Sequence, residues 1–187
     1  MKRVGLMAGL MVVLMGAGAV AQEPSPEATS LFAPDDLMFT LPSAIGEYEL
    51  SLTDGSVTDV LATKPEQREF WRQMLLPFGR GPEDGRLAFG TAYDSWGDMM
   101  ATVFAIRVTG VPAESLTDVF LGTVMGWYED MPDLDPQWLD VDGRRIQALT
   151  GDDYPFPSYL YPTGEVLYFI GIASDDLAIE ELLAELP

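Results

Sequence analysis

The chain has 187 residues, of which 30 are acidic and 10 are basic, and its net charge is −20. Nucleic acids and anionic membrane surfaces attract basic patches, so this charge argues against both classes of partner. The chain also contains no cysteine and no histidine. Disulfides, thiol catalysis, Ser-His-Asp triads and His-ligated metal sites are therefore excluded, which leaves carboxylate chemistry, hard-metal binding or no chemistry.

The first 21 residues have the pattern of a cleavable export signal. Lys2 and Arg3 precede an apolar run over residues 6–15, and the small residues that end at Ala21 fit the rule for signal peptidase. We expect cleavage between Ala21 and Gln22 and export to the periplasm or the medium, with no membrane span left in the exported chain. Because the chain has no cysteine, it has no lipobox, and we expect it not to be a lipoprotein. Removal of the leader takes away two cations and leaves a net charge of −22.

The exported part is expected to be one domain behind a flexible lead-in. Residues 22–40 are rich in proline and glutamate and show no periodicity, which is typical of a flexible segment. We expect the single domain over residues 41–187. Polar and apolar residues alternate over residues 48–52, which predicts a half-buried strand, and the Asp-Gly pair at residues 54–55 predicts the turn that ends it.

Two helices and then two strands are predicted next. Ser56 can cap a short helix over residues 57–63, and Pro65 suits the first position of a second helix. The second helix has one apolar face, formed by Phe70, Trp71, Met74, Leu75 and Phe78. Strands follow at residues 86–93 and 101–109.

A third helix is predicted from residue 112 to about residue 128. Gly122 and Gly126 lie in its interior, where each costs about 1 kcal/mol relative to alanine. We interpret them as residues that let the helix backbone pack closely on a sheet.

Hairpins fill most of the remaining chain. Strands at residues 138–141 and 144–149 flank Asp142-Gly143, which is the strongest short hairpin signal in the sequence. A second hairpin pairs residues 158–161 with residues 165–173, and its apolar second strand is typical of a central strand covered on both faces.

A last helix is predicted after Ser174. The chain thus reads as an α+β domain with an antiparallel sheet of about 5–7 strands and helices packed mainly on one face. A helix followed by a strand pair occurs twice, which leaves open a pseudo-duplicated α-β-β core.

Four short segments of the sequence stand out, at residues 75–84, 105–110, 141–146 and 159–169. Together they resemble pieces of uncharacterised exported bacterial α+β domains, and the resemblance covers about residues 41–187. These motifs are turns and core strands rather than site residues. The resemblance therefore implies the fold and export but no activity, cofactor or functional residue.

The densest acidic stretch offers candidate ligands for calcium. Asp133, Asp135, Asp140 and Asp142 supply closely spaced carboxylates, as calcium requires. The EF-hand template does not fit, however. If Gly143 were the glycine of the calcium loop, Trp138 would occupy the first ligand position. We favour the alternative of an acidic loop followed by an Asp-Gly turn.

A carboxylate pair offers a second candidate site. Asp152 and Asp153 lie beside aromatic residues that could stack on sugar rings, so they suggest a glycoside hydrolase. Adjacent residues of a strand point to opposite faces, however, so the two carboxylates could not flank one bond if the segment is extended.

Aromatic residues suggest a contact surface. Tyr154, Phe156, Tyr159 and Tyr161 alternate with prolines, and Trp96 lies with Met99 and Met100 in the connection between residues 93 and 101. Aromatic side chains with polar tips suit binding surfaces. The alternative is that they pack at the edge of the sheet, where prolines discourage aggregation.

Three functions stay open at this point. We favour a non-catalytic acidic domain, without a cofactor, that binds an unidentified protein or small ligand in the cell envelope or the medium. The alternatives are a carboxylate-dependent hydrolase of glycans or cell-wall material, and a calcium-responsive module.

Overall fold

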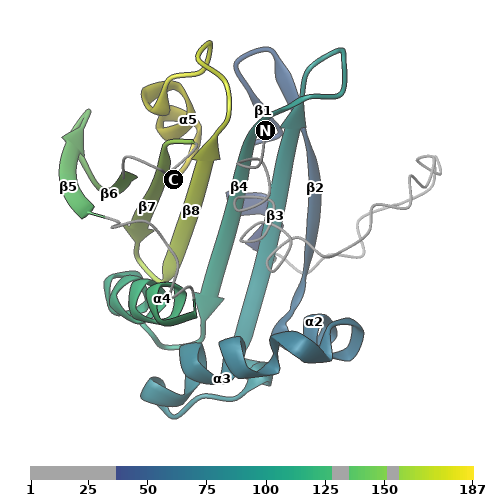
Figure 1. Cartoon of the computed structure of the whole chain (residues 1–187), viewed down its shortest axis with the longest axis vertical. Helices are drawn as coiled ribbons and strands as arrows, with labels where there is room; N and C mark the ends of the chain where they lie inside the picture. Colours follow the sequence, from purple (N-terminus) through teal and green to yellow (C-terminus); the bar gives the residue numbers. More distant parts are fainter. Residues whose placement is uncertain (1–36, 128–134, 151–155) are drawn as a thin grey trace. The chain divides into compact units, whose positions relative to one another are not determined.

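The structure is a computed structural model of the chain, and it describes residues 37–127, 135–150 and 156–187 (Figure 1). The strands in these residues are β1 (Ala44–Ile45), β2 (Tyr48–Ser56), β3 (Gly85–Tyr93), β4 (Met99–Val108), β5 (Asp135–Val141), β6 (Arg144–Thr150), β7 (Ser158–Thr163) and β8 (Val166–Ile172). The α-helices are α2 (Val57–Thr63), α3 (Arg68–Leu75), α4 (Ala113–Trp127) and α5 (Ile179–Glu185). Short 3-10 helices are η1 (Leu37–Thr40), η2 (Pro65–Gln67), η3 (Leu76–Phe78) and η4 (Pro82–Asp84).

The strands form one antiparallel sheet in the order β1-β2-β3-β4-β8-β7-β6-β5. Two meanders, β1 to β4 and β5 to β8, meet where β4 pairs with β8. This arrangement agrees with the predicted α+β class and antiparallel sheet. The predicted count of about 5–7 strands is wrong, because the described residues form eight. The missed strand is β1, whose two residues are too few to show an alternating pattern.

The two α-β-β segments do not occupy equivalent positions in this sheet. The pair β3–β4, which follows α2 and α3, lies in the interior of the sheet, whereas the pair β5–β6, which follows α4, lies at one edge. The sheet order therefore does not support a duplicated α-β-β core.

The start of α2 shows how local sequence determines an element. The Ser56 hydroxyl accepts a hydrogen bond from the Asp59 backbone N–H at 3.1 Å, and the Asp59 carboxylate accepts one from the Ser56 N–H at 3.0 Å. This reciprocal capping box confirms the predicted helix over residues 57–63 and its cap. The turn predicted at residues 54–55 is wrong, because both residues continue β2 and pair with β3.

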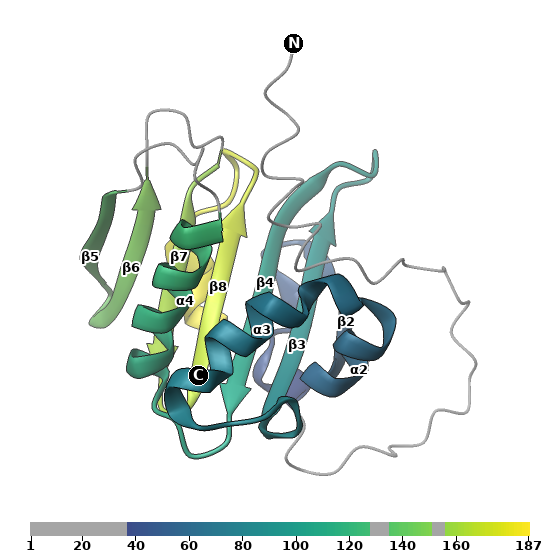
Figure 2. The ribbon, with the colours of Figure 1, turned by 60° about the horizontal axis from the view of Figure 1, so that its bottom comes forward.

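Helices α2, α3 and α4 cover one face of the sheet, here called the α4 face (Figure 2). Phe120 of α4 packs against Phe169 of β8 with ring centroids 6.0 Å apart. Gly85 is required where α2 meets β3, because a Cβ there would lie 2.5 Å from the Val57 side chain. The prediction that helices pack mainly on one face therefore holds for these three helices.

The opposite face, here called the α5 face, is covered by α5 and η1. Leu182, Leu183 and Leu186 pack there with Leu37 and Leu41 on a sheet surface that contains Ala92, Ala101 and Ala105. The small side chains let the short helices approach the strands. Because helices cover both faces, β8 is buried along almost its whole length, as predicted for a central strand.

Gly122 of α4 does not lie where the helix contacts the sheet. It is exposed, and a Cβ added there would meet no atom within 4 Å. The interpretation that it permits close packing on the sheet is therefore wrong. The side chains at residues 126–127 lie outside the described part, so Gly126 stays a prediction.

The β5–β6 hairpin at the edge has the predicted Asp-Gly turn. Asp142 and Gly143 have φ angles of 52° and 78°, as a type I′ turn requires. On β5, the ring of the half-exposed Trp138 packs against the Arg145 guanidinium, whose carbon lies 4.3 Å from the ring centroid. Among the helices that the structure describes, none is long and apolar enough to cross a membrane.

Candidate functional site

Two turns that are far apart in sequence lie together at one end of the sheet, the upper end in Figure 1. One turn joins β1 to β2, and the other joins β3 to β4. They are neighbours because β2 pairs with β3, with Leu50 opposite Ala92 near the ends of both strands. A pocket of about 520 Å³ opens beside them. Its lining, here called the aromatic pocket, consists of Glu47, Tyr48, Glu49, Tyr93, Asp94, Ser95 and Trp96.

Asp94 organises the β3–β4 turn. Its carboxylate Oδ1 accepts hydrogen bonds from the backbone N–H groups of Trp96 and Asp98, both at 2.8 Å. The Asp94 N–H donates to the Asp98 carbonyl at 2.9 Å. Gly97 completes the turn with a φ of 86°, which a residue with a side chain would adopt only at a cost. The turn therefore holds Trp96 in a defined position at its tip.

Trp96, at the tip of the turn, is unusually exposed for a large aromatic side chain. The Trp96 side chain is 88 % exposed, and Tyr93 beside it is 52 % exposed. Tyr48 is half-buried and packs against the core of the α5 face. Single exposed apolar residues are common on protein surfaces, but aromatic residues gathered around a pocket are typical of binding sites.

The aromatic pocket is also electronegative. Glu47, Glu49 and Asp94 contribute carboxylates to it, and none of its lining residues is basic. Desolvation raises the pKa of the Tyr48 hydroxyl, and the charges of Glu47, Asp176 and Asp94 raise it further. The pocket therefore combines apolar ring surface with negative charge.

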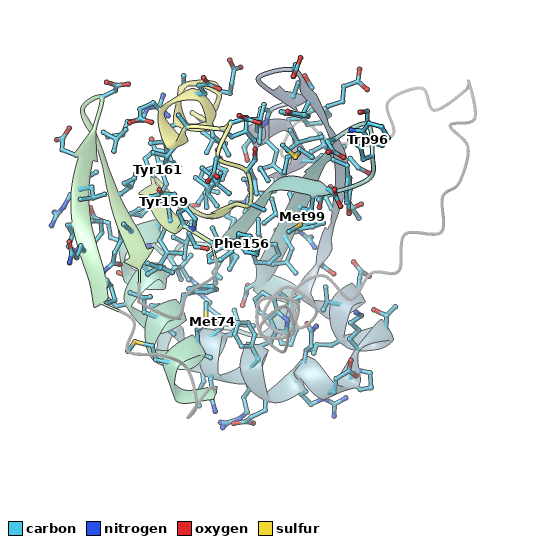
Figure 3. The ribbon with its side chains drawn as sticks, turned by 45° about the horizontal axis from the view of Figure 1, so that its top comes forward. Met74, Trp96, Met99, Phe156, Tyr159 and Tyr161 are labelled. Atoms are coloured by element: carbon cyan, nitrogen blue, oxygen red, sulfur yellow. The ribbon has the colours of Figure 1, made fainter. Side chains whose placement is uncertain are left out.

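The structure separates the aromatic residues that the sequence suggested as one contact surface (Figure 3). Trp96 lies at the aromatic pocket, whereas Tyr159 and Tyr161 lie together on the opposite side of this view and Phe156 lies between them and Met99. Phe156 and Tyr159 are half-buried. Tyr161 is buried and belongs to the core of the α5 face, so it does not contribute to an exposed surface. Tyr154 lies outside the described residues.

The methionines expected in the same exposed connection as Trp96 are placed differently. Met99 and Met100 begin β4 and are half-buried. Met100 packs against the core of the α5 face. The β3–β4 connection therefore leaves Trp96 almost fully accessible, whereas the two methionines are only partly exposed.

The predicted calcium ligands lie at the edge hairpin. The Asp140 carboxylate accepts a hydrogen bond from the Gly143 N–H at 3.0 Å, and Asp142 occupies the turn itself. Asp133 and the side chain of Asp135 lie outside the described part, as do Asp152 and Asp153. Within the described residues, no group of three or more acidic side chains could hold a metal ion.

Sequence reasoning found Trp96 but missed the rest of the aromatic pocket. Tyr48 and Tyr93 each lie at one end of a predicted strand beside acidic residues, and this pattern could have indicated that they belong to the pocket. Their proximity depends on the pairing of β2 with β3 across two intervening helices, and no local pattern encodes that pairing.

Comparison of the chain with protein-family models, with curated proteins and with solved structures finds no match.

Proposed function

We propose that this chain is an exported, non-catalytic domain that binds a partner outside the cytoplasm through its aromatic pocket. The observation that carries the proposal is the 88 % exposed Trp96 on a turn braced by Asp94. A large apolar ring exposed to water gains free energy when a partner covers it. The hydrogen bonds of Asp94 fix the backbone that carries this ring, so little backbone entropy is lost on binding. The export signal predicted at residues 1–21 supports the location.

The composition supports binding rather than catalysis. Without histidine or cysteine, the chain lacks the side chains most often used as a general base or as a nucleophile near neutral pH. The carboxylates of the pocket surround aromatic rings at an open surface, whereas a catalytic carboxyl usually needs a site that excludes water.

The proposal predicts that capture of a partner depends on Trp96. The full chain is immobilised and exposed to an envelope extract of the native host, and the retained material is compared for the wild type and Trp96→Ala. We expect the wild type to retain a specific component and Trp96→Ala to lose most of it.

Trp138→Ala is the matched control, because it removes the same side chain from a site 42 % exposed on the edge strand β5. We expect this variant to retain the partner like the wild type. Equal retention by all three proteins, or no specific retention by the wild type, would overturn the proposal.

A further inference from the structure

We propose that the aromatic pocket binds the cationic side chain of a lysine or arginine in a basic segment of a partner protein. This inference rests on the proposed function and specifies the chemistry of the partner.

Charge complementarity favours a cation. Glu47, Glu49 and Asp94 line the pocket, and Asp176 is close enough to act on the Tyr48 hydroxyl. On the other side of the β1–β2 turn, Glu181 of α5 would lie 3.7 Å from a Cβ at Gly46. An anionic ligand would meet repulsion from several carboxylates, whereas a cation would be attracted by all of them.

The rings favour the same ligand. The face of an indole attracts a guanidinium or an ammonium group, and the carboxylates around it add to that attraction. This protein already contains such a pair, because the Arg145 guanidinium carbon lies 4.3 Å from the centroid of the Trp138 ring. Trp96 offers an equivalent ring surface beside three carboxylates.

The position of Trp96 favours a protein segment over a small free cation. Its side chain is 88 % exposed at the tip of a turn, so a small ion would leave most of the ring in water. A basic peptide could place its cation among the carboxylates and cover the ring with its aliphatic stem and backbone.

The test uses calorimetric titration of the full chain with defined probes. They are a short capped peptide with three arginines, the same peptide with citrulline at those positions, a triglutamate peptide, and free arginine. Citrulline is close to arginine in shape but is neutral, and it has a carbonyl oxygen in place of one NH2 group of the guanidinium. We expect the arginine peptide to bind at least about tenfold more tightly than the citrulline peptide or free arginine, and the glutamate peptide not to bind.

Matched variants locate the effect. The double variant Glu47→Gln with Glu49→Gln is expected to weaken binding of the arginine peptide about threefold to tenfold, and Trp96→Ala about threefold or more. The control double variant Glu114→Gln with Glu165→Gln removes the same charge from exposed residues at the opposite end of the sheet. We expect it to leave binding unchanged.

The possible failures are distinguishable. If the arginine and citrulline peptides bind equally tightly, and Trp96→Ala loses binding of both, the proposal of a cationic ligand is wrong and the proposed binding function stands. If the two double variants weaken binding of the arginine peptide equally, the peptide is attracted nonspecifically to an acidic protein, and the aromatic pocket is not its binding site. Free arginine that binds as tightly as the peptide would overturn the protein segment as the ligand.

Discussion

Trp96 and Tyr161 are both large aromatic residues, but the fold uses them in opposite ways. Trp96 is exposed at a turn and has no place in the core, whereas Tyr161 is buried and stacks on Tyr168 with ring centroids 5.9 Å apart. The Tyr161 hydroxyl donates a hydrogen bond to the Pro187 carbonyl at 2.9 Å. We therefore expect substitutions at the first residue to affect binding and at the second to affect stability.

Trp96→Ala is expected to change the free energy of unfolding by less than about 0.5 kcal/mol, because surface substitutions away from buried contacts usually have effects of this size. Denaturant unfolding of the full chain measures this value. A loss of about 2 kcal/mol or more would mean that Trp96 is structural, and would weaken the inference drawn from its exposure.

Tyr161→Phe is expected to lower the free energy of unfolding by about 1 kcal/mol, because it removes a hydrogen bond that anchors the C-terminal segment to β7. The same variant should retain the envelope partner as well as the wild type does. An unchanged stability, or a loss of capture without a loss of stability, would contradict this assignment.

Gly122→Ala is expected to raise the free energy of unfolding by about 0.5–1 kcal/mol, because alanine has the higher helix propensity. The added methyl group would meet no atom within 4 Å. Gly85→Ala is the contrasting variant, because its Cβ would lie 2.5 Å from Cγ2 and 3.3 Å from Cβ of the fully buried Val57. Thermal unfolding should show a higher midpoint temperature than the wild type for Gly122→Ala and a lower one for the contrasting variant. A lower midpoint for Gly122→Ala would contradict the exposed position of Gly122.

At the scale of elements, the capping box of α2 links stability to pH. Hydrogen bonds from the Ser56 hydroxyl and backbone lower the pKa of the Asp59 carboxyl. A carboxyl whose pKa is lower in the folded state contributes stability above its unfolded pKa, and the contribution is lost as the pH falls through the folded pKa.

Ser56→Ala is therefore expected to cost about 1 kcal/mol of stability at neutral pH, which is typical for loss of a helix cap. The difference from the wild type should narrow as the pH falls below the ordinary Asp59 pKa of 3.8. Urea unfolding at several pH values measures this difference. A difference that widens on acidification would contradict the role of Asp59.

Elements determined by neighbouring residues could be predicted from the sequence. The cap at Ser56 and the turn at residues 142–143 have signals within four residues, and the structure confirms both. The strand β1 could not be predicted, because its two residues owe their conformation to pairing with β2. Likewise, burial of Tyr161 depends on α5, which follows it in the chain and covers that face of the sheet.

At the scale of the whole molecule, the aromatic pocket is a product of sheet topology. The turn between β1 and β2 and the turn between β3 and β4 are separated by α2 and α3 in the sequence. The β2–β3 pairing brings them to the same end of the sheet. Tyr93 and Asp94 are close to Trp96 in the sequence, but Glu47, Tyr48 and Glu49 become its neighbours only through this pairing.

Binding of a partner at the aromatic pocket should cover the β1–β2 turn and the β3–β4 turn together. Hydrogen–deuterium exchange of the full chain, with and without the envelope component that it captures, measures whether both turns are covered. We predict that binding slows exchange over residues 46–49 and 93–98 and leaves the edge hairpin at residues 135–150 unchanged. Slowed exchange at that hairpin, with no change at the two turns of the aromatic pocket, would mean that the partner does not bind at the aromatic pocket.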